Sequence, residues 1–322
     1  MRPTGRGVVV AAIALAGFVS ARAFGARSLN AVVVPAACAF TLAALLVARA
    51  DPPRVVRDTP ADGFPGDERR VSLVVEGDGA LVTVRDALGP GLDGDGTIRT
   101  VADGRHGSYG VTLRDRGRHV LGPATVVVTD PFGLWQRSFT DARRAEVIVY
   151  PTIVPLIAPP RALAATIGAA GGRSEFAGVR EYVHGDPLRD VNWKASAKRP
   201  DEYLVTTYAG DGADARVVIA VERREGGDPD RAAITAASVA VACLDAGVAV
   251  GLRTPNGSLA PASDAGTRRR VLELLADLDR SGSADVDREG ARVVVRADDA
   301  GVTVDVDGET RPAAELLREG ST

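Results

Sequence analysis

The chain has 322 residues, of which 45% are hydrophobic and 25% charged, with 39 basic against 42 acidic side chains and a net charge of −3. This composition excludes a disordered, collagen-like or coiled-coil protein. The charge balance gives no global basic field for nucleic acid, and two cysteines cannot form a disulfide framework or a four-ligand zinc site. We expect Cys38 and Cys243 to act as small apolar packing groups.

Two apolar segments near the N-terminus predict a membrane hairpin. Gly7–Val19 carries no charge, and neither does Ser28–Ala48. A helix needs about 20 residues to cross a bilayer, a length that the first segment reaches by including Ser20–Phe24, with the Arg22 side chain extending to the interface. The short link around Arg27 leaves room only for a turn between helices. Residues 1–50 are therefore predicted to form a transmembrane helical hairpin.

A cleaved signal peptide is the alternative for the first segment. Two arginines precede an apolar core, and Ala21-Arg22-Ala23 resembles a cleavage site. The second apolar segment directly downstream favours the hairpin. The arginines that flank the hairpin outnumber Arg22 and Arg27 between its helices, and they are Arg2, Arg6, Arg49, Arg54 and Arg57. Because basic residues concentrate on the cytoplasmic side, we expect a multi-pass protein of the cell membrane with both termini in the cytoplasm.

Residues 51–151 follow a different pattern, with short runs of alternating apolar residues separated by Gly, Asp and Pro. The runs predicted as strands are 71–75, 81–84, 109–113, 124–129 and 147–150. Period-two runs at this spacing are typical of an antiparallel β-sandwich in which each sheet buries one face. We interpret His106 and His119 as ordinary surface residues on loops or strand ends.

Residues 152–210 are interpreted as a linker and a signature segment. The glycine-rich run 168–173 lacks the Gly-Lys-Ser/Thr ending of a phosphate-binding loop, so we interpret it as a flexible connection. The signature segment, 174–198, is dense in polar and aromatic residues. It contains Lys194 and Lys198, the two lysines of the whole chain.

Residues 211–322 alternate between strand and helix signals. Arg216–Val221 is a β-branched run of the kind that is buried on both faces of a parallel sheet. The further elements predicted are a helix over 229–246, a strand over 248–252, an amphipathic helix over 267–278, strands over 291–295 and 302–306, and a helix near 313–317. This order predicts a doubly wound α/β domain.

The signature segment resembles that of the domain of unknown function 58 family. It has the order Glu-Phe-x-Gly-x-Arg-Glu-Tyr, then Gly-Asp-x-x-Arg-Asp-x-x-Trp and Ala-Ser-Ala-Lys. The motifs at 116–123 (Arg-Gly-Arg-His-Val-Leu-Gly-Pro) and 130–134 (Asp-Pro-Phe-Gly-Leu) agree with that family, and the resemblance covers nearly the whole chain. It implies two membrane spans, a β domain and a von Willebrand factor A-like C-terminal domain.

Domains of the von Willebrand factor A type often bind magnesium through Asp-x-Ser-x-Ser after the first strand, because hard cations prefer such oxygen ligands. The corresponding residues here are 222–226, where Arg224 and Gly226 replace the two hydroxyl ligands. We therefore expect no metal at this position, and no cofactor.

Two interpretations of the signature segment stay open. It forms a surface that docks a partner protein, or it is internal structure that joins the two domains. The residues concerned are Arg180, Glu181, Asp186, Arg189, Asp190, Trp193, Lys194 and Lys198. Exposed Trp and Arg side chains suit a docking surface.

The favoured function is that of a membrane-anchored, non-catalytic scaffold or adaptor, since the resemblance implies work alongside MoxR-type AAA+ ATPases. The partners expected are such an ATPase and the lipid bilayer, with no nucleic acid. The alternative is an envelope-associated hydrolase that uses His184, with Ser196 as a conceivable nucleophile. The spacing of these residues provides no support for a catalytic triad.

Overall fold

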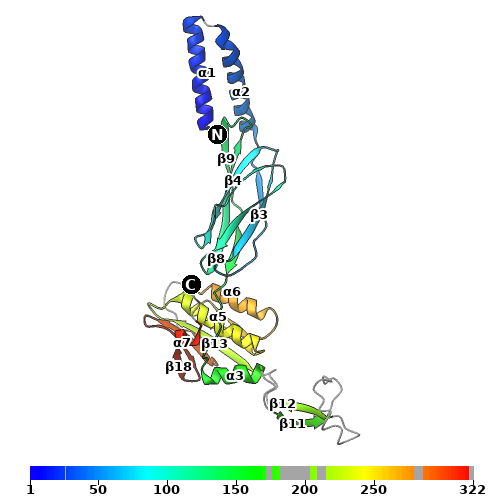
Figure 1. Cartoon of the computed structure of the whole chain (residues 1–322), viewed down its shortest axis with the longest axis vertical. Coiled ribbons are helices and arrows are strands. Elements are labelled where there is room, and N and C mark those ends of the chain that lie inside the picture. Colours follow the sequence, from blue (N-terminus) through cyan, green and yellow to red (C-terminus); the bar gives the residue numbers. More distant parts are fainter. Residues whose placement is uncertain (26, 172–175, 182–203, 209–214, 279–285, 319–322) are drawn as a thin grey trace. The chain divides into compact units, whose positions relative to one another are not determined.

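A computed structural model of the chain describes residues 1–25, 27–171, 176–181, 204–208, 215–278 and 286–318. The chain divides into two compact units, Met1–Val149 and Tyr150–Thr322 (Figure 1).

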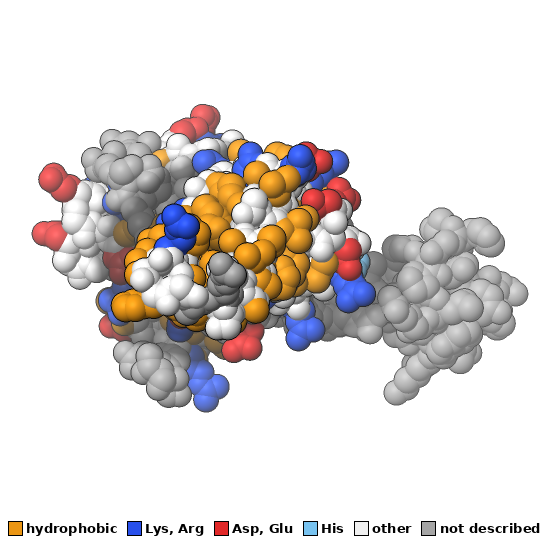
Figure 2. All heavy atoms as spheres, turned by 90° about the horizontal axis from the view of Figure 1, so that it is seen from above, with side chains coloured by type: hydrophobic (Ala, Val, Ile, Leu, Met, Phe, Trp, Pro, Cys, Tyr) orange, Lys and Arg blue, Asp and Glu red, His pale blue; other side chains and the backbone are white. Residues whose placement is uncertain are grey.

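The first unit begins with two long helices, α1 (Gly5–Phe24) and α2 (Asn30–Arg49), joined by a short 3-10 turn, η1 (Arg27–Leu29). Each helix has 20 residues, and their mean hydropathies reach 2.0 and 2.4. Only 6% and 11% of the most apolar 18-residue stretch of α1 and α2, respectively, are buried inside the protein. Both helices therefore have the length and composition of membrane spans. Figure 2, which looks onto the end with the helices, shows mainly hydrophobic side chains there.

Two antiparallel sheets form the remainder of the first unit. The larger sheet has the order β1-β9-β8-β4-β6, with β10 also paired to β8. Its strands are β1 (Arg2–Pro3), β4 (Leu81–Leu88), β6 (Thr97–Val101), β8 (Gly117–Thr129), β9 (Trp135–Asp141) and β10 (Ala145–Val149). The smaller sheet has the order β2-β3-β7-β5. Its strands are β2 (Arg54–Arg57), β3 (Glu68–Glu76), β5 (Leu92–Asp93) and β7 (His106–Leu113).

The core of this unit lies between the two sheets, because every second residue of the long strands is apolar and points inward. In β3 the buried positions are Val71, Leu73 and Val75, and in β4 they include Val82 and Val84. One cluster of buried residues contains side chains from both sheets. The expected β-sandwich is confirmed.

The second unit contains a mixed sheet in the order β15-β14-β13-β16-β17-β18. Its strands are β13 (Arg216–Arg223), β14 (Ala249–Thr254), β15 (Gly257–Ala262), β16 (Val293–Asp298), β17 (Gly301–Val306) and β18 (Glu309–Pro312). The central strand β13 runs parallel to both β14 and β16, and the remaining pairs are antiparallel. The outer strands follow their neighbours through connections that are too short for a parallel crossover.

The helices of this unit are α3 (Arg161–Gly171), α5 (Pro229–Asp245), α6 (Thr267–Ala276) and α7 (Ala313–Leu316). Helix α5 starts at a proline and is capped by Asp228, whose side chain accepts hydrogen bonds from the N–H groups of Asp230 and Arg231. Cys243 is fully buried on this helix, and burial raises the pKa of its thiol to about 12. The packing role expected for this thiol agrees with its position.

Part of the segment interpreted as a linker belongs to this second unit. The Val154 N–H donates to Ser238 on α5 at 2.9 Å, and the Ile157 N–H donates to the carbonyl of Leu316 at 2.9 Å. The helix α3 then continues to Gly171, so the first residues of the glycine-rich run 168–173 are helical. The expectation of a flexible connection was wrong for these residues, since the three alanines and the leucine before them favour helix propagation.

Candidate functional site

The structure describes two of the predicted binding residues, Arg180 and Glu181. Arg180 and Glu181 end β11 (Phe176–Glu181), which pairs with β12 (Leu204–Tyr208) in a two-stranded antiparallel sheet. Arg180 is opposite Val205 and Glu181 is opposite Leu204. The other predicted binding residues lie outside the described residues, in the sequence between these strands, and they are Asp186, Arg189, Asp190, Trp193, Lys194 and Lys198. His184 and Ser196 of the alternative hydrolase hypothesis lie outside them too.

The carboxyl end of β13 carries a buried carboxylate. The side chain of Glu222 is only 4% exposed and forms ion pairs with the guanidinium groups of Arg288 and Arg296. Arg296 lies directly opposite Glu222 on the parallel strand β16. This carboxylate stands first in the stretch 222–226, where the sequence led us to expect no metal. Two fixed cations therefore occupy the surroundings in which a divalent cation would need negative charge.

The residues that follow Glu222 form a tight turn against β16. The Arg224 N–H donates to the carbonyl of Ala297 at 2.9 Å, and the Gly227 N–H donates to the carbonyl of Arg224 at 3.1 Å. Gly226 has φ +81°, and a Cβ at Gly227 would lie 2.4 Å from the Ala297 carbonyl oxygen. Two glycines are needed here by backbone geometry.

A groove of about 750 Å³ lies next to β15 in the same unit. Arg253 and Asp287 form an ion pair in its wall, and Asn256 donates from its side-chain amide to the carbonyl of Asp277 at 2.8 Å. These three polar side chains of the lining therefore already have partners within the unit.

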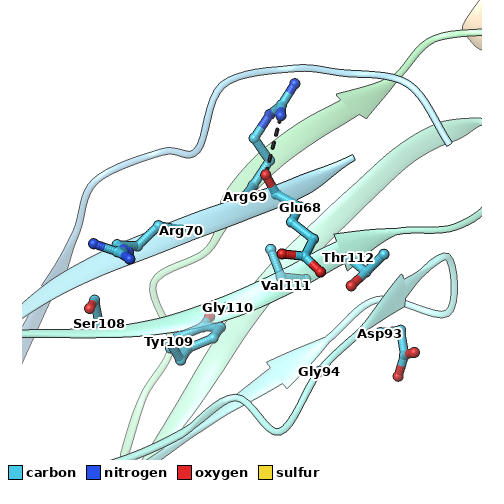
Figure 3. A pocket seen from close by; sticks show the side chains of 10 residues that line it. All are labelled: Glu68, Arg69, Arg70, Asp93, Gly94, Ser108, Tyr109, Gly110, Val111 and Thr112. Carbon is cyan, nitrogen blue, oxygen red and sulfur yellow. Dashed lines mark hydrogen bonds between the residues drawn. The ribbon is translucent and has the colours of Figure 1, made fainter. Parts of the chain in front are cut away.

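A second groove, of about 610 Å³, lies on the sandwich along β3 and β7 (Figure 3). Its lining includes Glu68, Arg70, Asp93 and Tyr109. The Tyr109 hydroxyl donates to Asp86 in the core at 2.8 Å, and burial followed by this hydrogen bond raises the tyrosine pKa far above its ordinary value. The phenol is therefore a fixed hydrogen-bond donor rather than an acid or base.

The motif at 116–123 has a structural role in the sandwich. His119 is 8% exposed on β8, where its Nε2 lies 2.6 Å from the carbonyl oxygen of Asp115. A Cβ at Gly91 would lie 2.0 Å from the imidazole, so this glycine makes room for the ring. The prediction that His119 is a surface residue was wrong, because it lies at an inward position of the strand. His106 is exposed at the start of β7, as expected.

The motif at 130–134 forms a loop that contacts the start of α1. The buried carboxylate of Asp130 accepts hydrogen bonds from the N–H groups of Phe132 (2.8 Å), Leu134 (2.8 Å) and Trp135 (2.6 Å). The Leu134 carbonyl in turn accepts a hydrogen bond from the Thr4 N–H at 2.8 Å. Residue spacing alone gave no signal for this contact, since the two segments lie far apart in the chain.

No protein-family model matches the sequence, and no curated protein matches it. Similar solved structures include the PKD domain of an M14-like peptidase from a Thermoplasmatales archaeon, with 16% identity and a TM-score of 0.21 over 31% of this chain and 94% of that one. The SrpA adhesin of Streptococcus sanguinis shows 12% identity and a TM-score of 0.22 over 41% and 82% of the two chains.

A fragment of native alpha-2-macroglobulin from Escherichia coli, spanning domain MG7 to the C-terminus, shows 14% identity and a TM-score of 0.24. It is covered over 22% of its length, against 40% of this chain. The TM-scores of all three structures are too low for these likenesses to carry an argument about function.

Proposed function

We propose that the protein is a membrane-anchored, non-catalytic scaffold or adaptor of the domain of unknown function 58 family. The observation that carries the proposal is the pair of apolar helices, whose surfaces are almost entirely uncovered by protein. In water such a surface would be strongly unfavourable, whereas a bilayer accommodates it. Both termini and the body of the protein then lie in the cytoplasm, on the side favoured by the flanking arginines.

The contacts between the helices and the sandwich support an anchor that holds the body close to the bilayer. Arg137 on β9 donates to the carbonyl of Ala48 at 3.0 Å, at the end of α2. The rings of Phe40 on α2 and Trp135 on β9 pack with centroids 5.0 Å apart. Tryptophan is common at membrane–water interfaces. These contacts would hold the sandwich at a fixed distance from the bilayer.

We further propose that the second unit is von Willebrand factor A-like and serves as the interaction module. Its central parallel strands and its largely buried helix α5 are compatible with that fold. By resemblance, its partner is a MoxR-type AAA+ ATPase. The docking surface would be the signature segment, 174–198, in which Arg180 and Glu181 end the strand β11 that pairs with β12.

Several polar groups that chemistry would require are committed to the structure instead. His119 contacts a backbone carbonyl, Tyr109 donates to Asp86, and Glu222 is held by two arginines. These contacts support a structural rather than a catalytic use of the described residues.

Cysteine labelling in intact cells tests the proposed topology. In a Cys38→Ala background, Ser28→Cys reports on the turn between the helices and Ser258→Cys on the second unit, and both serines are exposed. The remaining native thiol, Cys243, is fully buried. A membrane-impermeant reagent should label position 28 in intact cells but position 258 only after permeabilisation. Labelling of position 258 in intact cells would exclude a cytoplasmic partner.

A further inference from the structure

A third groove, which we call the juxtamembrane groove, lies beside the first turn of α1. It has a volume of about 570 Å³. Its lining includes Arg6 from α1, Leu81 and Thr83 from β4, Arg99 from β6, and Phe132 from the loop after β8. The charge-free run of α1 begins immediately after Arg6. With α1 as a membrane span, the groove lies at the depth of the lipid headgroups.

The loop that forms one wall is held firmly against α1. A Cβ at Gly7 would lie 2.1 Å from the carbonyl oxygen of Leu134, so the helix and the loop are in direct backbone contact. The Asp130 carboxylate fixes the loop through its three backbone hydrogen bonds. Despite this order, the Phe132 ring is 56% exposed, and Leu81 on the same groove is 49% exposed. Two large apolar side chains thus face outward at the level of the membrane surface.

The groove also has an excess of positive charge. Arg6 and Arg99 are both exposed, and neither forms an ion pair with any described residue. The one acidic side chain in the lining, Asp130, is 3% exposed and already accepts backbone hydrogen bonds. Arg99 lies opposite Thr83 in the sheet, which places its backbone on the groove wall. The guanidinium groups are therefore available to an anion.

We propose that the juxtamembrane groove binds the headgroup of an anionic phospholipid. Arg6 and Arg99 contact the phosphate oxygens, since a guanidinium matches phosphate geometry. Phe132 and Leu81 insert beside the first methylene groups of the lipid. The proposal rests on the proposed role of α1 and α2 as membrane spans.

A lipid fits this groove better than a soluble phosphate does. Exposed Phe132 and Leu81 have no use in binding an inorganic anion, but they gain from transfer into the interface. An anionic leaflet also adds a surface potential that favours nearby arginines. The occupant is thus expected to need both a negative headgroup and acyl chains.

Native mass spectrometry of the full chain in neutral detergent tests the proposal. The chain is titrated with phosphatidylglycerol, phosphatidylcholine or inorganic phosphate, using wild type, Arg6→Gln, Arg99→Gln and the double variant. Arg85→Gln is the matched control, because Arg85 is an exposed arginine on the same face of β4 that does not line the groove. The double variant Arg6→Lys with Arg99→Lys retains the charge.

Phosphatidylglycerol should bind wild type and Arg85→Gln in preference to phosphatidylcholine. Each Arg→Gln change should weaken it about fivefold, the size expected for one arginine near an anionic surface, and the lysine variant should retain most of the affinity. Equal lipid binding by wild type and the double Gln variant would overturn the proposal, as would equal affinity for inorganic phosphate. Carbonate extraction of wild type from vesicles reports separately on the anchor, so that failure of the lipid site leaves the anchor intact and measurable.

Discussion

Arg57 and Asp86 form a buried, bidentate ion pair that joins the two sheets of the β-sandwich. Nε and Nη2 of the arginine lie 2.7 Å from Oδ2 and Oδ1 of the carboxylate, and the side chains are 3% and 0% exposed. Arg57 belongs to β2 in one sheet and Asp86 to β4 in the other. The Tyr109 hydroxyl also donates to this carboxylate, and Tyr109 lies on β7 in the same sheet as Arg57. The pair therefore fixes the relative position of the two sheets.

Removal of one partner should be costly. Asp86→Ala leaves the Arg57 charge buried without its partner, for which about 3–5 kcal/mol of unfolding free energy is expected. The matched control is Asp93→Ala, which breaks a surface pair with Arg114 whose side chains are 62% and 60% exposed, and should cost less than about 1 kcal/mol. Unfolding of the detergent-solubilised chain in guanidinium chloride measures the loss of unfolding free energy in both variants. Similar losses for the two variants would contradict the buried role of Asp86.

Stability should also fall in acid through Asp141 at the end of β9. Burial alone would raise the pKa of this carboxyl, but hydrogen bonds from the N–H groups of Val55 and Arg143 and nearby guanidinium charge outweigh it and lower the pKa. A lowered pKa stabilises the fold above the unfolded value of about 3.9, and this contribution is lost as the pH falls through the folded pKa.

This effect is measured by following the melting temperature of wild type and Asp141→Asn from neutral pH down to about pH 3, below the unfolded carboxyl pKa. Asp141→Asn should be less stable than wild type at neutral pH, and the two curves should converge in acid. A constant difference at every pH would show that the loss comes from packing rather than from the charge.

The contact between α1 and the loop after β8 predicts a difference between two neighbouring glycines. Alanine at Gly7 would meet the Leu134 carbonyl, whereas a Cβ at Gly5 has nothing within 4 Å. Alanine favours helix over glycine by about 1 kcal/mol, but the clash at Gly7 should cost about 1–3 kcal/mol. Gly7→Ala should therefore lower the melting temperature in detergent, while Gly5→Ala leaves it unchanged or raises it. Equal melting temperatures would argue against the close contact.

The ion pairs of Glu222 with Arg288 and Arg296 predict that divalent cations do not change the thermal stability of the chain. Because Arg288 and Arg296 neutralise this carboxylate, millimolar Mg²⁺ should not change the thermal midpoint of the chain, whereas a ligand that binds the native state would raise it. Glu222→Ala should lower the midpoint by removing the partner of both arginines. A Mg²⁺-dependent rise in wild type that is absent from the variant would establish a metal site here.

Sequence periodicity located the long strands and helices because their apolar faces repeat over several residues. The strands that it missed are short or carry many polar side chains, and they are β1, β2, β5, β6, β9, β11, β12, β15 and β18. Periodicity also did not predict the three antiparallel strand pairs in the mixed sheet of the second unit. Alternation of strands and helices indicates which elements exist, but the direction of a strand depends on connections that are only a few residues long.

The burial of Asp86 can be predicted from the sequence. Val82, Val84 and Asp86 share one face of β4, so the alternation itself places Asp86 in the core, where a carboxylate requires a partner. Its partner Arg57 lies 29 residues away, and no spacing rule identifies it. The juxtamembrane groove was out of reach in the same way, because Arg6 and Arg99 meet only through the fold.

The most direct test of the adaptor proposal is affinity capture from detergent-solubilised native membranes, with bound proteins identified by mass spectrometry. Wild type is compared with Arg189→Ala and Lys194→Ala in the signature segment, and His184→Gln and Arg85→Ala serve as control substitutions. Unchanged phenotypes in cells that carry His184→Gln would separately exclude the hydrolase alternative. We expect wild type, His184→Gln and Arg85→Ala to capture a MoxR-type AAA+ ATPase that both signature variants lose. Capture of no such ATPase by wild type would contradict the adaptor proposal.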